Sequence, residues 1–98
     1  MNRKLTETEK RIYLIFSIIF EKIMDEAAGY QQGTYQWNLL RPSLMQSIGL
    51  DDEIWESMSD TGDEDPDIQE ELAILRQKYE KLSKDEIIRD FSSIFTAK

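Results

Sequence analysis

The stretch Ile12-Tyr-Leu-Ile-Phe-Ser-Ile-Ile-Phe20 decides the fold of this 98-residue chain. Only Ser17 interrupts its apolar run, and apolar residues continue beyond it at helical spacing, at Ile23, Met24, Ala27 and Ala28. Thr6 and Glu9 have the spacing of a capping box, so we predict a long helix that begins near Glu7 and stops at Gly29. Since this helix is apolar almost all round, other elements should cover it on several sides.

The same run has the length of a signal-peptide core, with Arg3 and Lys4 as its charged head. Against that interpretation, Glu7 and Glu9 lie in the head region, Glu21 follows the run directly, and no convincing cleavage site is present. A membrane span needs about 20 apolar residues, and charges interrupt this run sooner. We therefore expect a core helix of a cytoplasmic protein and no contact with a membrane.

Residues 30–41 give a mixed signal. Tyr35, Trp37 and Leu39 alternate with amides as in a strand, but a single short strand has nothing to pair with. We predict a structured loop or a short helical turn. Its three aromatic residues, which include Tyr30, either cover the end of the first helix or form a binding platform, because Tyr and Trp dominate interface hot spots.

Further helices are predicted after this segment. Their expected starts are Pro42, Asp51 or Asp52, Asp65-Pro66, and Ser83, which forms a second capping box with Glu86. Their expected apolar faces are Leu44, Met45 and Ile48; Ile54, Trp55 and Met58; Ile68, Leu72, Leu75, Tyr79 and Leu82; and Ile87, Ile88, Phe91, Ile94 and Phe95. Residues 59–65 are expected to be a polar loop. The predicted fold is all-α, a single domain over residues 1–98 with four to five helices around the long N-terminal one.

Histidine and cysteine are absent from the sequence, which excludes disulfides, zinc sites built from these residues, and Ser-His or Cys-His nucleophiles. No glycine-rich phosphate loop or G-x-S-x-G elbow is present either. The acid-rich region does not fit the EF-hand calcium loop. A loop that started at Asp60 would have Asp65 at the position that requires glycine, and one that started at Asp63 would have Ile68 there. We expect no enzyme activity, no cofactor and no specific metal site.

Acidic residues are concentrated in residues 51–71. This segment holds eleven Asp and Glu and no Lys or Arg, whereas residues 1–50 sum to +1 and residues 72–98 to +2. The formal net charge of -8 therefore comes from this one segment. Such a charge repels nucleic acids and anionic membranes and attracts a basic protein.

With these features the chain resembles small, acidic, helical bacterial immunity proteins that neutralise toxic nucleases, including those of contact-dependent inhibition systems. The resemblance rests on size, on the apolar helix at residues 12–20 and on the acidic segment, with no diagnostic motif. It implies a monomer that binds a basic toxin at or beside its active site. Phage inhibitors that mimic nucleic acid share this appearance, and a helical module that self-associates through residues 68–82 is a further alternative.

The residues predicted to bind the partner fall into two groups. Carboxylates would supply electrostatic attraction, and one or both tryptophans would anchor the complex. The predicted set is Asp52, Glu53, Glu56, Asp60, Asp63, Glu64, Asp67, Glu70, Glu71, Trp37 and Trp55.

Overall fold

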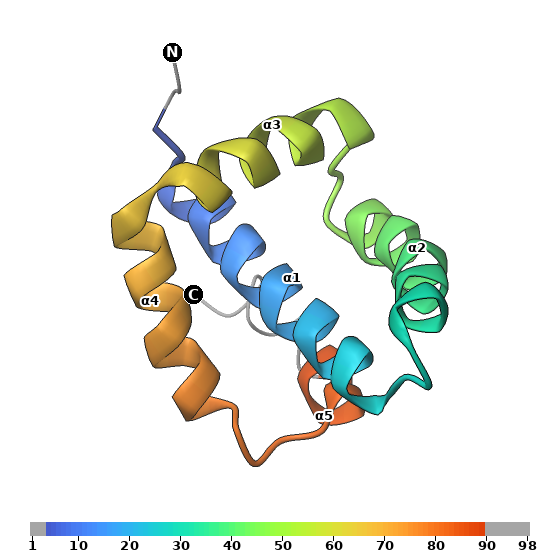
Figure 1. Cartoon of the computed structure of the whole chain (residues 1–98). Helices are drawn as coiled ribbons and strands as arrows, with labels where there is room; N and C mark the ends of the chain where they lie inside the picture. The colour runs from blue at the N-terminus through green and yellow to red at the C-terminus, as the bar shows by residue number, and fades with distance from the viewer. Residues whose placement is uncertain (1–3, 90–98) are drawn as a thin grey trace.

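The computed structural model describes residues 4–89, and this part of the chain forms five helices and no strand. The helices are α1 (Glu7–Glu26), α2 (Tyr30–Ser47), α3 (Asp52–Glu64), α4 (Pro66–Lys78) and α5 (Lys84–Arg89). Figure 1 shows α1 crossing the middle of the molecule, with the other four helices placed around it. The predicted all-α fold around a long N-terminal helix is confirmed.

Helix α1 begins where its sequence predicts. The Glu9 amide donates to the Thr6 hydroxyl at 3.1 Å, and the Thr6 amide donates to the Glu9 carboxylate at 3.0 Å, which completes the capping box. The helix ends at Glu26, slightly before the predicted stop at Gly29. No helix within residues 4–89 combines the length and the apolar character that crossing a bilayer requires.

Helix α1 also supplies most of the core. Within residues 4–89, eight of the fifteen buried hydrophobic side chains belong to it, so the other helices are held together largely through α1. The eight are Ile12, Tyr13, Leu14, Ile15, Phe16, Ile18, Ile19 and Ile23. Helices α2, α3, α4 and α5 all contact α1, as expected for a helix that is apolar on most of its circumference.

The prediction of a loop or short turn at residues 30–41 is wrong, and so is the prediction that Pro42 starts a helix. Both lie inside α2, a continuous helix of 18 residues. Trp37 and Leu44 are buried on its inner side, while Pro42 lies on the exposed side. A proline is tolerated there because the Asn38 carbonyl that loses its hydrogen bond is on an exposed residue and can bind water.

The predicted polar loop at residues 59–65 is wrong as well, because α3 continues to Glu64. Met58, Thr61 and Gly62 are buried on one side of it, so the helix is maintained by packing in spite of its polar composition. Asp51 is the residue that caps α3, and its carboxylate accepts from the Ile54 amide at 2.9 Å. Ile54, expected to point inward, is 40% exposed.

The starts of α4 and α5 agree with the sequence. Asp65 caps α4 ahead of Pro66, and Ser83 and Glu86 form the second capping box. Ile68 and Leu72 are buried in the core, and Leu75, Tyr79 and Leu82 pack against it, although α4 ends at Lys78. The expected continuation of the last helix, Phe91, Ile94 and Phe95, lies outside the described residues.

Candidate functional site

The acidic residues of α3 share one side of the helix. Successive residues are about 100° apart around a helix axis, which places these six within an arc of about 120°. They are Asp52, Glu53, Glu56, Asp60, Asp63 and Glu64, and all six are exposed. Met58, the most deeply buried residue of α3, points nearly opposite to this arc. One side of α3 therefore binds the core while the other presents carboxylates to solvent.

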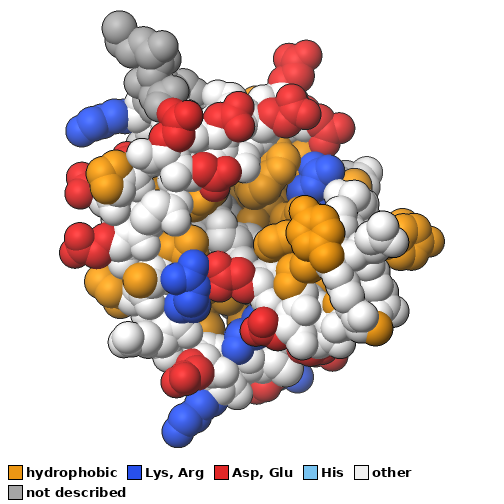
Figure 2. Space-filling view, viewed as in Figure 1, with side chains coloured by type: hydrophobic (Ala, Val, Ile, Leu, Met, Phe, Trp, Pro, Cys, Tyr) orange, Lys and Arg blue, Asp and Glu red, His pale blue; other side chains and the backbone are white. Residues whose placement is uncertain are grey.

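The acidic arc continues onto the first turns of α4. Asp67 and Glu70 are exposed there and Glu71 is partly exposed, while the intervening Ile68 points into the core. In Figure 2 acidic side chains follow the upper and left edges of the molecule, over α3 and α4 of Figure 1. We call the nine predicted carboxylates of α3 and α4 the acidic face.

Among residues 4–89, two carboxylates of the acidic face form ion pairs with bases of other helices. Arg41 Nη1 lies 3.4 Å from Asp52 Oδ1, and Lys10 Nζ lies 3.2 Å from Glu71 Oε2. The pairing with Glu7 and Glu71 raises the pKa of Lys10. Solvent and salt screen ion pairs at the surface, so these two carboxylates remain open to exchange with an external base.

Most carboxylates of the acidic face have no basic partner among residues 4–89. In the described part of the chain no base lies within ion-pair distance of six of its carboxylates, Glu53, Glu56, Asp60, Asp63, Asp67 and Glu70. Arg76, the base best placed in sequence to neutralise the face, forms a bidentate pair with Glu21 of α1 instead, with both distances 2.7 Å.

A hydrogen-bonded cluster fixes the corner between α3 and α4. The Tyr13 hydroxyl donates to Asp63 Oδ1 at 2.6 Å and accepts from Gln69 Nε2 at 2.9 Å. Gln69 also donates to the Gly62 carbonyl at 2.8 Å. Burial and the Asp63 carboxylate raise the pKa of Tyr13. One hydroxyl of the core helix thus positions the helix end that carries Asp63.

Close approach of Tyr13 to α3 depends on Gly62. A Cβ atom at position 62 would lie 2.7 Å from the Tyr13 ring, so only glycine fits at this point of the helix. The sequence gives no indication of this contact, because Gly62 in a polar stretch has the same signature as a loop glycine. Sequence reasoning accordingly missed Tyr13 and Gln69 as positioning residues.

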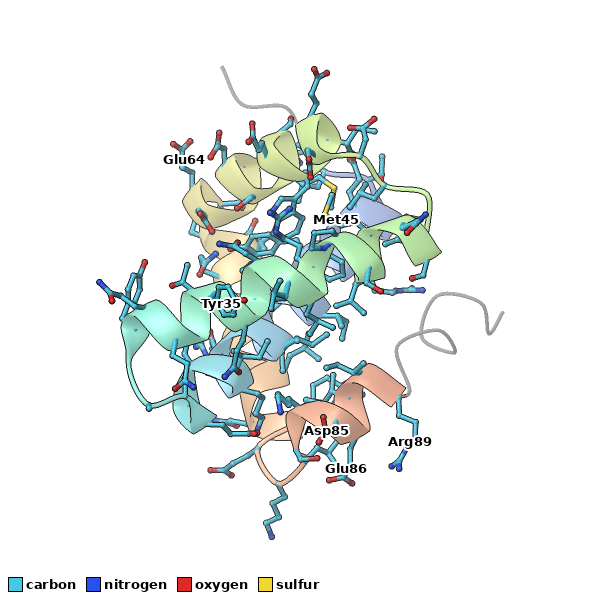
Figure 3. All side chains as sticks on the ribbon, turned by 90° about the vertical axis from the view of Figure 1, so that its right-hand side faces the viewer. Tyr35, Met45, Glu64, Asp85, Glu86 and Arg89 are labelled. Carbon is cyan, nitrogen blue, oxygen red and sulfur yellow. The ribbon has the colours of Figure 1, made fainter. Side chains whose placement is uncertain are left out.

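The two predicted anchors, Trp37 and Trp55, are in contact. Their ring centroids are 6.4 Å apart, and both rings also contact Phe16 of α1, at 5.8 and 5.0 Å. Trp37 is only 8% exposed, so it does not protrude as a free anchor, and Trp55 is half-buried. Tyr35, by contrast, is 65% exposed on the outer side of α2 (Figure 3).

The geometry also bears on metal binding and on self-association. Within residues 4–89, no group of three or more acidic side chains converges closely enough to hold a metal ion. The seam proposed for self-association packs against the core of the same chain; its residues are Ile68, Leu72, Leu75, Tyr79 and Leu82. Comparison with protein-family models, with curated proteins and with solved structures finds no match to this chain.

Proposed function

We propose that this chain is a binding protein without enzyme activity that neutralises a basic protein partner, specifically an immunity protein that inhibits a toxic nuclease. The observation that carries the proposal is the acidic face itself. It gathers nine carboxylates on two adjoining helices, and six of them have no base within ion-pair distance among the described residues. Such a surface is costly for the free protein, and a cationic partner would remove that cost.

The mechanism follows from the position of the carboxylates on a rigid scaffold. A nuclease must hold the phosphates of its substrate with lysine and arginine, and carboxylates on α3 and α4 would bind the same side chains. Opposite charges accelerate the encounter, and the association should weaken as salt screens it. The bound inhibitor would cover the cationic site and keep nucleic acid away from it.

The proposal is tested with the double charge reversal Glu56→Lys and Asp60→Lys. Both side chains are exposed in the middle of α3 and neither has an ion-pair partner among the described residues, so the helix should persist. The partner is the basic protein that co-purifies with the chain from its source cell at low salt. We expect the reversal to weaken this complex at least about a hundredfold, because two close charge pairs become repulsive.

The matched control is Asp25→Lys with Glu80→Lys, which changes the net charge equally on exposed residues outside the acidic face. It should retain most of the affinity. Nuclease activity of the partner is measured in parallel, with wild-type protein expected to suppress it and the α3 variant not. Equal losses in both variants, or an affinity that does not respond to salt, would contradict the proposal.

A further inference from the structure

A cavity opens on the face of the molecule shown in Figure 2, between α1, α2, α3 and α4. Its volume is about 410 Å³, near the lower end of the range of roughly 300–1,000 Å³ that is typical of ligand pockets. In Figure 2 the hollow is bordered by hydrophobic side chains on the right and by charged ones below. These two kinds of wall determine what it can bind.

The aromatic wall consists of Phe16, Phe20, Trp37 and Trp55. Their rings meet edge to face or tilted, with centroids 5.0–6.4 Å apart, so each ring is held in place by its neighbours. A fixed indole face attracts the planar guanidinium of arginine by stacking and by the cation–π interaction. The same wall accepts the apolar methylene groups of that side chain.

The polar wall contributes one more carboxylate than bases. Glu21 and Arg76 neutralise one another through their bidentate pair, which leaves the charge of Asp63 uncompensated in the cavity. Tyr13 donates to Oδ1 of Asp63, and no base of the described residues lies within ion-pair distance of this carboxylate. Its second oxygen is therefore available to an external donor, at the margin between cavity and acidic face.

We infer that this cavity is a recognition pocket for an arginine side chain of the basic partner. The methylene groups and the guanidinium plane of that arginine would pack against the tryptophans, and its terminal nitrogens would donate to Asp63. The inference rests on the proposed function and makes it specific, because it identifies one inserted residue among the many cationic contacts. The inference also assigns a role to Trp37, which lines the pocket although little of it is exposed on the surface.

The experiment uses the two tryptophans as reporters, since both line the cavity and the sequence contains no others. N-acetyl-arginine amide is titrated into the full chain at constant ionic strength while tryptophan fluorescence is recorded. We expect a saturable change with a Kd on the order of millimolar, as suits a ligand of this size. The citrulline analogue has nearly the same shape without the charge, and it should bind at least about tenfold more weakly.

Two variants locate the site. Asp63→Asn removes the charge but can still accept from Tyr13, and it should weaken N-acetyl-arginine amide about tenfold, whereas Asp25→Asn removes an exposed charge outside the cavity and should change nothing. Equal binding of the two ligands, equal effects of the two variants, or no saturable change would overturn the pocket.

These outcomes are separate from the test of the proposed function. If the α3 reversal abolishes the protein complex while N-acetyl-arginine amide produces no saturable signal, the acidic face stands and the pocket is wrong. If N-acetyl-arginine amide binds as expected but the α3 reversal does not change the affinity for the protein partner, the cavity is a guanidinium site and the proposed function is wrong.

Discussion

The Tyr13 hydroxyl joins three helices at a single atom. It lies on α1, donates to Asp63 of α3 and accepts from Gln69 of α4. A hydrogen bond to a charged group contributes about 1.5–3 kcal/mol to stability. Because Asp63 belongs to both the acidic face and the cavity, this hydroxyl links the stability of the core to the position of a binding residue.

The free energy of unfolding at high pH should depend on the hydrogen bonds of the Tyr13 hydroxyl. The pKa of Tyr13 is raised by burial and by Asp63, so the folded state retains the phenol proton at a pH where the unfolded chain has released it. The contribution is therefore fully present below the unfolded pKa of about 10 and is lost as the pH rises above it. We expect Tyr13→Phe to cost about 1–2 kcal/mol at neutral pH and to flatten the decline above pH 10.

This prediction is measured by urea unfolding of both proteins across the alkaline range. The wild type should lose free energy of unfolding more steeply than Tyr13→Phe, so the two curves converge. Parallel curves would mean that the hydroxyl is not protected in the folded state. The comparison cancels Lys10, whose pKa is also raised, because both proteins contain it.

At the scale of the helix, contact between α1 and α3 depends on a missing side chain. Gly62→Ala should gain about 1 kcal/mol of helix propensity but lose about 1–3 kcal/mol to overpacking against the rigid Tyr13 ring, for a net loss of about 1 kcal/mol. Gly33→Ala on α2 is the control, because its Cβ meets mainly the flexible end of Met24. That variant should be as stable as the wild type or more so.

Thermal and urea unfolding of the two alanine variants check this prediction. In a Tyr13→Leu background the penalty of Gly62→Ala should disappear, since the ring that meets the new Cβ is gone. A stabilising Gly62→Ala in the wild-type background would show that α3 and α1 are not in close contact there.

The elements that the sequence predicted well are those with strong local signals. The capping boxes at Thr6 and Ser83 and the Asp65-Pro66 start were readable because each depends on residues three or fewer positions apart. The acidic residues of α3 are predictable as a charged segment, but the length of the helix that carries them is not. The missed parts depend on tertiary contacts, since α2 stays helical across Pro42 and α3 across Gly62 through packing against α1.

The molecule as a whole combines an apolar centre with a lopsided charge. Among the described residues, bases of α4 and α5 pair with acids of α1, Arg76 with Glu21 and Lys84 with Glu26, and only Arg41 of α2 pairs with an acid of α3, Asp52. The acidic face therefore keeps most of its repulsion in the free protein. Binding surfaces often reduce the stability of the free protein, here through charge repulsion that a partner of opposite charge would remove.

The free protein should accordingly become more stable when its own acidic face is relieved. Like charges at i and i+4 destabilise a helix by about 0.2–0.5 kcal/mol per pair, and Glu56→Lys with Asp60→Lys replaces several repulsive pairs along α3 with attractive ones. We expect a gain of about 1 kcal/mol in free energy of unfolding at about 20 mM salt, shrinking toward zero at about 0.5 M as screening removes the repulsion from the wild type.

Asp25→Lys with Glu80→Lys shifts the net charge equally and should gain less, because those residues lie outside the cluster. Thermal unfolding of the three proteins at both salt concentrations measures this, and a wild type that loses stability with added salt would mean that its carboxylates are already compensated within the chain.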